Sequence, residues 1–217
     1  NPGTVQPDNP VSILHIVDIS SYPTITEVGT YEFPSNLQGW DIEVHGSYAY
    51  VASGDAGISV IDVSDASSPQ LVITAAPSTV DGVTHSFETV SVGSGFVVGT
   101  TGYGGEVFNI STPALPTSTG SFISTYPRDV VIESRTIDDE DATILFIADQ
   151  AAGLSLFELD SESAPERRGA LSLPLAADDC LDPNGIACST SAVAVDVRDS
   201  TAFVSTNLGL FGILLGF

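Results

Sequence analysis

Residues 40–72 read WDIEVHGSYAYVASGDAGISVIDVSDASSPQLV, and weaker copies of this phrase return along the chain at a period of about 45 residues. The copies align on a glycine that closes a tight turn and opens an apolar segment ending in a polar residue: Gly57, Gly105, Gly153 and Gly209. The first two intervals are 48 residues each and the third is 56. Self-similarity at a fixed period predicts a repeat architecture.

A second regularity supports the alignment. The polar residue that ends the apolar segment is followed seven positions later by a proline, as in Asp62 with Pro69 and Asn109 with Pro116, and again in Glu158 with Pro165. A partial copy, Ile13–Ser20, lies near the N-terminus with Pro23 soon after it. Four units and a leading half unit are therefore expected.

Each unit is expected to fold as β-strands. Val, Ile, Tyr, Phe and Thr alternate with small or polar residues at period two, and Gly, Pro, Asp and Ser interrupt them every eight to twelve residues or so. In residues 40–74 we expect four strands, called a to d: Asp41–Val44, Tyr48–Ala52, Ile58–Val63 and Gln70–Thr74. No helical stripe with caps is found. The pattern predicts an all-β protein of four-stranded antiparallel blades, a β-propeller, with almost no helix.

The phrase resembles the LVIVD repeat of bacterial and archaeal secreted or surface propellers. The resemblance lies in residues 47–52, 55–57, 60–65 and 68–69. It implies a propeller fold, usually without a known enzymatic activity. It implies no site residues, because the shared positions are turn and core positions.

The predicted organisation is an extended linker over residues 1–10 and one propeller domain over residues 11–217. Its repeat units span about 11–36, 37–80, 81–126, 127–175 and 190–217. The N-terminal unit has only c-like and d-like strands, while the last unit has a-like, b-like and c-like strands at Ala192–Val197, Thr201–Thr206 and Gly209–Leu215. A ring of four blades, a five-bladed ring short of some strands, and a piece of something longer all fit this count.

The charge balance restricts the partners. The chain has 28 acidic residues, five arginines and no lysine, with a formal net charge of −23. Such a surface disfavours nucleic acid and anionic lipid as partners, and other proteins are expected instead. The acidity fits either adaptation to high salt, which the absence of lysine favours, or a face that binds cations or a basic partner. No run of 18 apolar residues could span a membrane.

The extracytoplasmic setting is inferred from the ends and the cysteines. The chain lacks methionine and opens with a Pro-rich segment, as a mature secreted, periplasmic or cell-surface protein would. Cys180 and Cys188 flank an Asp-Pro-Asn-Gly turn, which favours a disulfide between them. Two cysteines without clustered histidines support zinc poorly.

Calcium is the one cofactor considered. Oxygen ligands gather in the cysteine loop at Asp178, Asp179, Asp182 and Asn184, and a second acidic run, residues 138–141, is expected in an extended a–b hairpin. The spacing in the cysteine loop does not match an EF-hand, and solvated acidic turns are the simpler explanation of both runs. We expect no other cofactor.

An enzyme is the alternative function. Some propellers hydrolyse esters or lactones with a metal held at the central channel, where the a strands begin. Asp41 and Asp129 occupy matching positions on predicted a strands, with Glu43 and Asp196 aligned two residues further on. A ring of such carboxylates could bind a divalent ion. The ring is incomplete, however, because Ala194 takes this position in the last unit and the second unit offers no clear equivalent.

We therefore interpret the chain as a non-catalytic propeller that serves as a structural or protein-interaction module in a surface or secreted assembly. Aromatic residues near turns are the candidate contact residues, because aromatics dominate interface hot spots: Tyr22, Tyr103 and Tyr126. Arg167 and Arg168 form the one basic pair and are candidates for anchoring a partner carboxylate.

Overall fold

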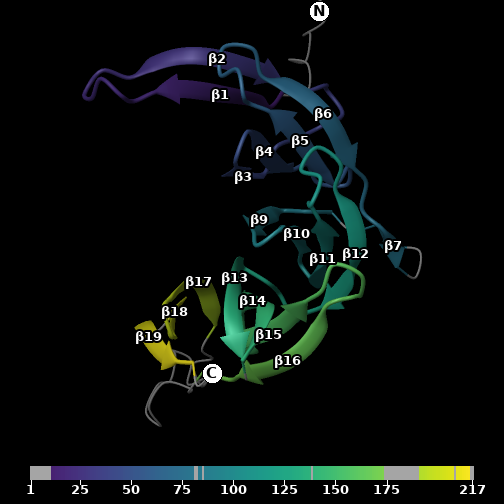
Figure 1. Cartoon of the computed structure of the whole chain (residues 1–217), viewed down its shortest axis with the longest axis vertical. Helices are drawn as coiled ribbons and strands as arrows, with labels where there is room; N and C mark the ends of the chain where they lie inside the picture. The colour runs from purple at the N-terminus through teal and green to yellow at the C-terminus, as the bar shows by residue number, and fades with distance from the viewer. Residues whose placement is uncertain are drawn as a thin grey trace, which may run out of the picture.

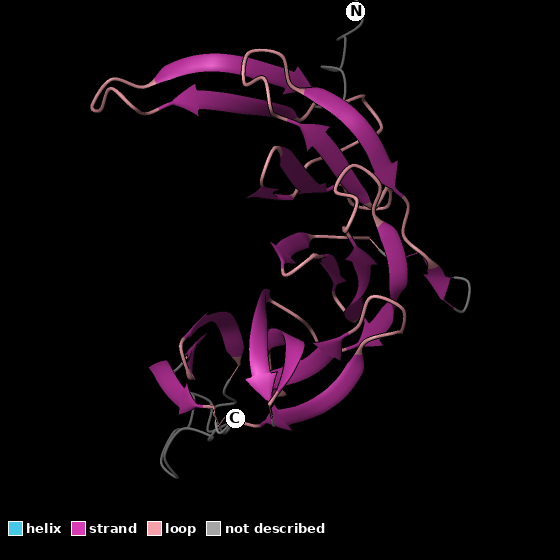
Figure 2. Cartoon of the chain, viewed as in Figure 1, coloured by secondary structure: helices cyan, strands magenta, loops and turns pink. Residues whose placement is uncertain are grey.

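The fold is known from a computed structural model that describes residues 11–80, 83–84, 86–137, 139–173, 191–207 and 209–215. These residues form strands and loops and no helix (Figure 2). The all-β prediction is therefore confirmed for this part of the chain. None of its elements is a helix long and apolar enough to cross a membrane.

Three complete four-stranded sheets follow one another along the chain, each with neighbouring strands antiparallel. The first matches the four strands predicted for residues 40–74 to within one residue at each end. In chain order the sheets are β3 (Asp41–His45), β4 (Tyr48–Ala52), β5 (Ile58–Asp62) and β6 (Gln70–Ala75); β9 (Thr89–Gly93), β10 (Phe96–Thr101), β11 (Gly104–Asn109) and β12 (Thr117–Ile123); β13 (Asp129–Ile137), β14 (Glu140–Asp149), β15 (Gly153–Leu159) and β16 (Glu166–Leu171).

Partial sheets flank this series. The N-terminal one pairs β1 (Ile13–Asp18) with β2 (Thr26–Glu32), and the C-terminal one contains β17 (Ala192–Arg198), β18 (Thr201–Thr206) and β19 (Gly209–Leu214). A small hairpin, β7 (Thr79–Val80) and β8 (Val83–Thr84), lies between the first two complete sheets. The c-like and d-like N-terminal strands and the a-, b- and c-like C-terminal strands were all predicted.

The sheets are arranged as an open arc, with β1–β2 at one end and β17–β19 at the other (Figure 1). β1 and β2 pair with each other and with no C-terminal strand among the described residues. A closed ring of four or five blades is thus not what the structure shows, although each complete sheet has the strand order of a blade. The long β13–β14 hairpin confirms the extended a–b hairpin predicted around residues 138–141.

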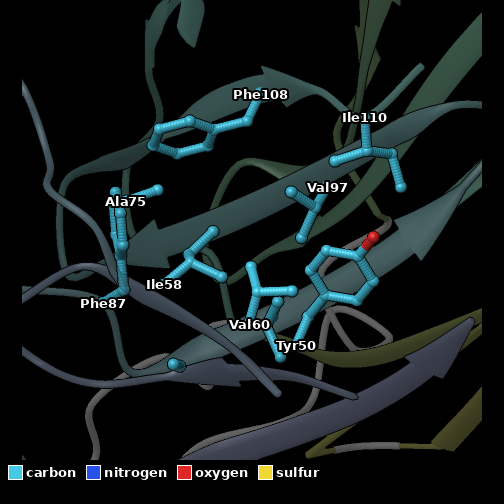
Figure 3. Packing of buried hydrophobic residues seen from close by; sticks show 10 residues of the cluster. Tyr50, Ile58, Val60, Ala75, Phe87, Val97, Phe108 and Ile110 are labelled. Carbon is cyan, nitrogen blue, oxygen red and sulfur yellow. The ribbon is translucent and has the colours of Figure 1, made fainter. Parts of the chain in front are cut away.

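Apolar side chains between successive sheets form the core. Tyr50, Ile58 and Val60 of one sheet meet Val97 and Phe108 of the next (Figure 3). These side chains are fully or almost fully buried, and the Phe87 and Phe108 rings meet edge to face. Burying large apolar side chains in this way supplies most of the stabilisation of such a sheet stack.

The polar residue that recurs at the end of the c strands has a local explanation. The Oδ1 atoms of Asp18, Asp62 and Asn109 accept hydrogen bonds from the amides of Ser20, Ser64 and Ser111, at 2.8, 2.9 and 2.7 Å. Such side-chain-to-backbone bonds start a turn. Glu158 departs from this pattern, and Asp160 takes over the role by accepting from the Glu162 amide at 2.7 Å.

A register shift recurs just before this polar residue in every c–d strand pair. It lies between Ile16 and Val17, and at the matching positions of the other pairs: Val60/Ile61, Val107/Phe108 and Leu156/Phe157. A bulge bends and twists its strand, so its repetition gives each sheet the same curvature. It also confirms that the N-terminal hairpin is a partial copy of the repeat.

Candidate functional site

The innermost strands of successive sheets lie beside one another: β3 next to β9, β9 next to β13, and β13 next to β17. Each is the edge of its own sheet, so its outward amides have no strand partner. The carboxylates that the sequence placed on predicted a strands lie on these edges.

Asp41 and Asp129 make the same pair of hydrogen bonds in two different sheets. Oδ1 of Asp41 accepts from the following amide, Ile42, at 2.9 Å, and its Oδ2 accepts from the amide of Val90 on the neighbouring innermost strand at 3.0 Å. Asp129 repeats this with Val130 at 3.0 Å and Val195 at 2.9 Å. Both oxygens of each carboxylate therefore bind backbone amides, and each Asp joins two sheets.

Glu43 extends the contact between β3 and β9, because its Oε2 accepts from the Val92 amide at 2.6 Å. Burial raises the pKa of Glu43 and that of Asp129 above the usual carboxylate values. The charge of Asp41 raises both pKa values further, and Asp196 adds to the effect at Asp129. The four carboxylates are thus close enough to interact, although Asp196 itself is exposed.

This geometry suits structural bonding better than metal binding. Across the described residues no three His, Cys, Asp or Glu side chains are placed to hold a metal ion. Each of the two equivalent aspartates points one oxygen at an amide of its own strand and the other at an amide of the neighbouring strand, whereas a metal centre needs oxygens that converge on one point. In the sheet between them Thr89 takes the equivalent position, and its hydroxyl bonds that of Thr100.

Two further acidic residues, which sequence reasoning missed, are buried. Glu106 accepts from the amide and hydroxyl of Ser78, at 2.7 and 3.0 Å, and from the Ser118 hydroxyl. Asp149 accepts from the amides of Thr125 and Tyr126, both at 2.9 Å.

A signal for these two residues exists in the repeat alignment. Asp149 also bonds the Ser155 hydroxyl at 3.0 Å, just as Ser53 bonds Ser59 at 2.8 Å at the same two positions of the first complete sheet. Polar residues recurring after strand b and early in strand c could have marked this buried pair. We assign a structural role to Glu106 and Asp149, because each hydrogen bond that they accept comes from a loop or a strand of this chain.

The predicted contact residues have different surroundings. Tyr22 and Tyr103 are highly exposed. Arg167 is exposed. Arg168 pairs with Glu158 of the adjacent strand at 2.5 Å and with Glu166 of its own strand at 3.2 Å. Arg168 therefore offers less free charge to a partner than the sequence suggested.

Tyr126 lies in a surface hollow of about 240 Å³ that we call the aromatic hollow, lined by Trp40, Glu88, Thr89, Thr100, Thr101, Tyr126, Pro127 and Arg128. The Arg128 guanidinium lies 5.6 Å from the centre of the Tyr126 ring, within range of a cation–π contact. Trp40 is mostly exposed, and it lines both this hollow and a second one of about 260 Å³. Sequence reasoning named Tyr126 but missed Arg128 and Glu88, which loops bring to it.

The predicted disulfide between Cys180 and Cys188 falls outside the described residues. So do the calcium ligands predicted at Asp178, Asp179, Asp182 and Asn184, and the linker over residues 1–10. These three remain predictions.

Taken together, the fold defines a class: an all-β repeat protein built of small blade-like antiparallel sheets stacked along an arc. Residues 38–76, which include the first complete sheet, match the LVIVD repeat, and the resemblance stated from the sequence is confirmed for this segment. A search of curated proteins gives no significant match.

Solved structures of similar fold include two computationally designed proteins. The Ika4 protein superposes with a TM-score of 0.50 at 14% identity, over 82% of this chain and 92% of that one. The Ika8 protein superposes with a TM-score of 0.54 at 13% identity, over 88% of this chain and 49% of that one. At such low identity the likeness concerns the fold alone.

Proposed function

We propose that the protein is a non-catalytic, extracytoplasmic module of propeller type that acts as a structural or protein-interaction component of a secreted or cell-surface assembly. The LVIVD repeat and the β-rich repeat fold are compatible with such a role. The observation that carries the proposal is the aromatic hollow, which Trp40, Tyr126 and Arg128 line together, with the Arg128 guanidinium over the Tyr126 ring. Exposed aromatics and arginine are the residues that most often dominate protein interfaces.

The chemistry of the hollow indicates the partner group. Arg128 forms no ion pair with any described residue, so its guanidinium is available to a carboxylate. Trp40 and Tyr126 supply apolar area beside that cation. A protein segment with an acidic side chain next to an apolar one fits this arrangement.

Binding to envelope or secreted proteins of the source organism tests the proposal. Arg128→Ala and Tyr126→Ala should each weaken binding at least tenfold, as expected for a hot-spot residue. Arg198→Ala, at an exposed arginine elsewhere, is the matched control and should bind as the unaltered protein does. Equal binding by all four proteins would overturn the assignment of the hollow.

A metal-dependent hydrolase that uses Asp41, Asp129, Glu43 and Asp196 is the second candidate. The observation that favours it is the raised pKa of Glu43 and of Asp129, because carboxylates with pKa values raised by burial also occur in catalytic sites. Ester or lactone hydrolysis that needs a divalent ion and disappears in Asp41→Asn/Asp129→Asn would favour it.

The remaining parts of the proposal concern the setting. A disulfide between Cys180 and Cys188 fits an oxidising compartment, and calcium bound in the same loop would join the carboxylates there. Thiol titration of the unfolded, unreduced protein should find no free thiol, and two reactive thiols would contradict the disulfide. The halophilic setting rests on the charge of −23 and the absence of lysine.

A further inference from the structure

One position of the repeat is exposed in all three complete sheets and has a different kind of side chain in each. It is the residue just before the innermost strand, namely Trp40 before β3, Glu88 before β9 and Arg128 before β13. The three amides donate the same hydrogen bond, at 2.9 Å, to a carbonyl of strand b in their own sheet: Ala52, Thr100 and Ala148. The repeat thus holds this backbone position alike in each sheet. An aromatic, an acidic and a basic side chain follow one another along the inner side of the arc (Figure 1).

All three of these side chains line the aromatic hollow. Glu88 and Arg128 have opposite charges, yet they form no ion pair with each other or with any other described residue. The hollow therefore presents an uncompensated negative charge and an uncompensated positive charge beside the rings of Trp40 and Tyr126. A ligand that bears both charges can pair with both residues.

The neutral polar groups of the hollow are already bonded within the fold. The hydroxyls of Thr89 and Thr100 bond each other, and the hydroxyl oxygen of Thr101 accepts from the Tyr103 amide at 3.1 Å. The charged groups of Glu88 and Arg128 are consequently the polar groups of the hollow that most need a partner. They determine the chemistry of the ligand.

The two aromatic rings lie against turns that have no side chain at the point of contact. A Cβ atom on Gly54 would lie 3.3 Å from Nε1 of Trp40, and one on Gly102 would lie 3.1 Å from Cε2 of Tyr126. Both distances are shorter than ordinary van der Waals contact, so each ring packs closely on the b–c turn of a different sheet. Rings that are positioned before binding lower the entropic cost of ordering them on a partner.

The charge of the whole chain also restricts the partner. At a net charge of −23 the protein repels a segment whose only charged side chains are acidic. A basic side chain beside Glu88 offsets this repulsion while an acidic side chain binds Arg128. A segment with both charges therefore fits the hollow and the field around it.

We propose that the aromatic hollow binds a dipolar segment of a partner protein, in which an apolar, a basic and an acidic side chain contact Trp40, Glu88 and Arg128 in that order. This inference rests on the interaction role proposed for the hollow. It adds the second charge of the partner and the order of the contacts, which follows from the order of the innermost strands.

A library of random short peptides displayed on phage and selected on the whole protein supplies the probe. We expect enriched peptides with an apolar, a basic and an acidic residue, whose binding is lost in Arg128→Ala. Trp40 is the one tryptophan of the chain, so its fluorescence reports the binding of a synthetic, tryptophan-free copy of such a peptide.

A double-mutant cycle tests the contact with Glu88. Replacing the basic residue of the peptide by alanine should weaken binding to the unaltered protein by about threefold or more, and should not affect binding to Glu88→Ala. Glu162→Ala, at an exposed acidic residue of another loop, is the matched control and should respond as the unaltered protein does. Glu88→Arg/Arg128→Glu should prefer a peptide in which the basic and acidic residues are exchanged. Circular dichroism checks that each variant is folded.

The possible failures are distinguishable. Peptides that depend on Arg128 but show no coupling between a basic residue and Glu88, or an exchanged variant that keeps the original preference, would overturn this inference and leave the proposed function standing. A selection without any peptide dependent on Arg128 would overturn both. Glycine betaine, a small zwitterion, is the alternative occupant. A saturable change in Trp40 fluorescence with betaine, when no peptide is enriched, would assign the hollow to small solutes instead.

Discussion

Asp41 and Asp129 show how one residue position can hold a repeat protein together. Each accepts one hydrogen bond from an amide of its own strand and one from an amide of the neighbouring sheet. The second amide lies 49 residues further along the chain for Asp41 and 66 residues further for Asp129. The sequence alignment matched these residues to each other correctly. It could not find their partners, because an amide carries no sequence signature, and from the sequence alone a carboxylate at the start of an innermost strand fits a metal ligand equally well.

Removing one of these carboxylates should loosen the junction between two sheets. In Asp129→Ala the Val195 amide loses its acceptor, and we expect the free energy of unfolding to fall by about 1–3 kcal/mol. Urea denaturation followed by tryptophan fluorescence or circular dichroism measures this. Asp55→Ala, at an exposed turn aspartate, should change it by less than about 0.5 kcal/mol. Equal stabilities of the two variants would contradict the role assigned to Asp129.

The raised pKa values of Glu43 and Asp129 give a prediction for pH. Because the folded state binds these protons more tightly than the unfolded state, their charged forms disfavour folding above the folded-state pKa. Their contribution to the free energy of unfolding therefore rises as the pH falls through the folded-state pKa. That pKa lies above the usual value of 4.5 for Glu43 and above the usual value of 3.8 for Asp129. Asp18 and Asp62, whose pKa values are lowered by bonds from Ser20 and Ser64, lose their stabilising effect only below 3.8.

Urea midpoints at several pH values from about 7 down to about 4 test this. The stability gained on acidification should be larger in the unaltered protein than in Glu43→Gln/Asp129→Asn. Glu32→Gln/Asp55→Asn makes the same change in net charge at exposed sites and should retain the full gain. If both double variants gain as much as the unaltered protein, the two buried carboxylates do not have the titration described.

At the scale of elements, the strands of the clearest unit were predictable because alternation and glycine turns are local signals. The outer d strands also carry a contact that the sequence hides. Gly29 and Gly120 hold the same position beside the bulge, and each lies against the c–d loop of the next unit, at residues 66–67 and Ala164. Gly169 holds this position on β16, but a Cβ there would meet nothing within 4 Å among the described residues.

This difference predicts that a glycine-to-alanine substitution destabilises the protein at one of these positions and has little effect at another. In Gly120→Ala the new Cβ would lie 2.7 Å from the Ala164 Cβ at a backbone φ of +148°, so we expect a loss of about 2 kcal/mol or more in the free energy of unfolding. Gly169→Ala should change it by less than about 0.5 kcal/mol. Thermal or urea unfolding decides, and a Gly169→Ala variant as unstable as Gly120→Ala would show that the loop contact is not the cause.

For the whole molecule, repeat counting predicted the units but not their arrangement. The sequence was compatible with a closed ring, whereas the structure is an open arc. β1 forms its backbone hydrogen bonds with β2, so β19 remains an edge strand of its own sheet. Ring closure depends on how each sheet is tilted against the next. That tilt follows from side-chain packing at every junction, which strand patterns do not encode.

The net charge also acts at this scale. With a charge of −23 the folded chain repels itself, and salt screens that repulsion. We expect the melting temperature to rise steadily with NaCl concentration up to about 1 M. Full stability at low salt, with no further gain on adding salt, would contradict adaptation to a saline setting.

The central proposal is that the innermost carboxylates serve to join sheets and not to hold a catalytic metal. Isothermal titration of Ca²⁺, Mg²⁺, Mn²⁺ and Zn²⁺ into the unaltered protein and into folded Asp41→Asn/Asp129→Asn tests it most directly. We expect every metal to give the same affinity and stoichiometry with both proteins, even if calcium binds elsewhere, while the variant unfolds at lower urea. A stoichiometric metal site present in the unaltered protein and lost in the variant would contradict the claim.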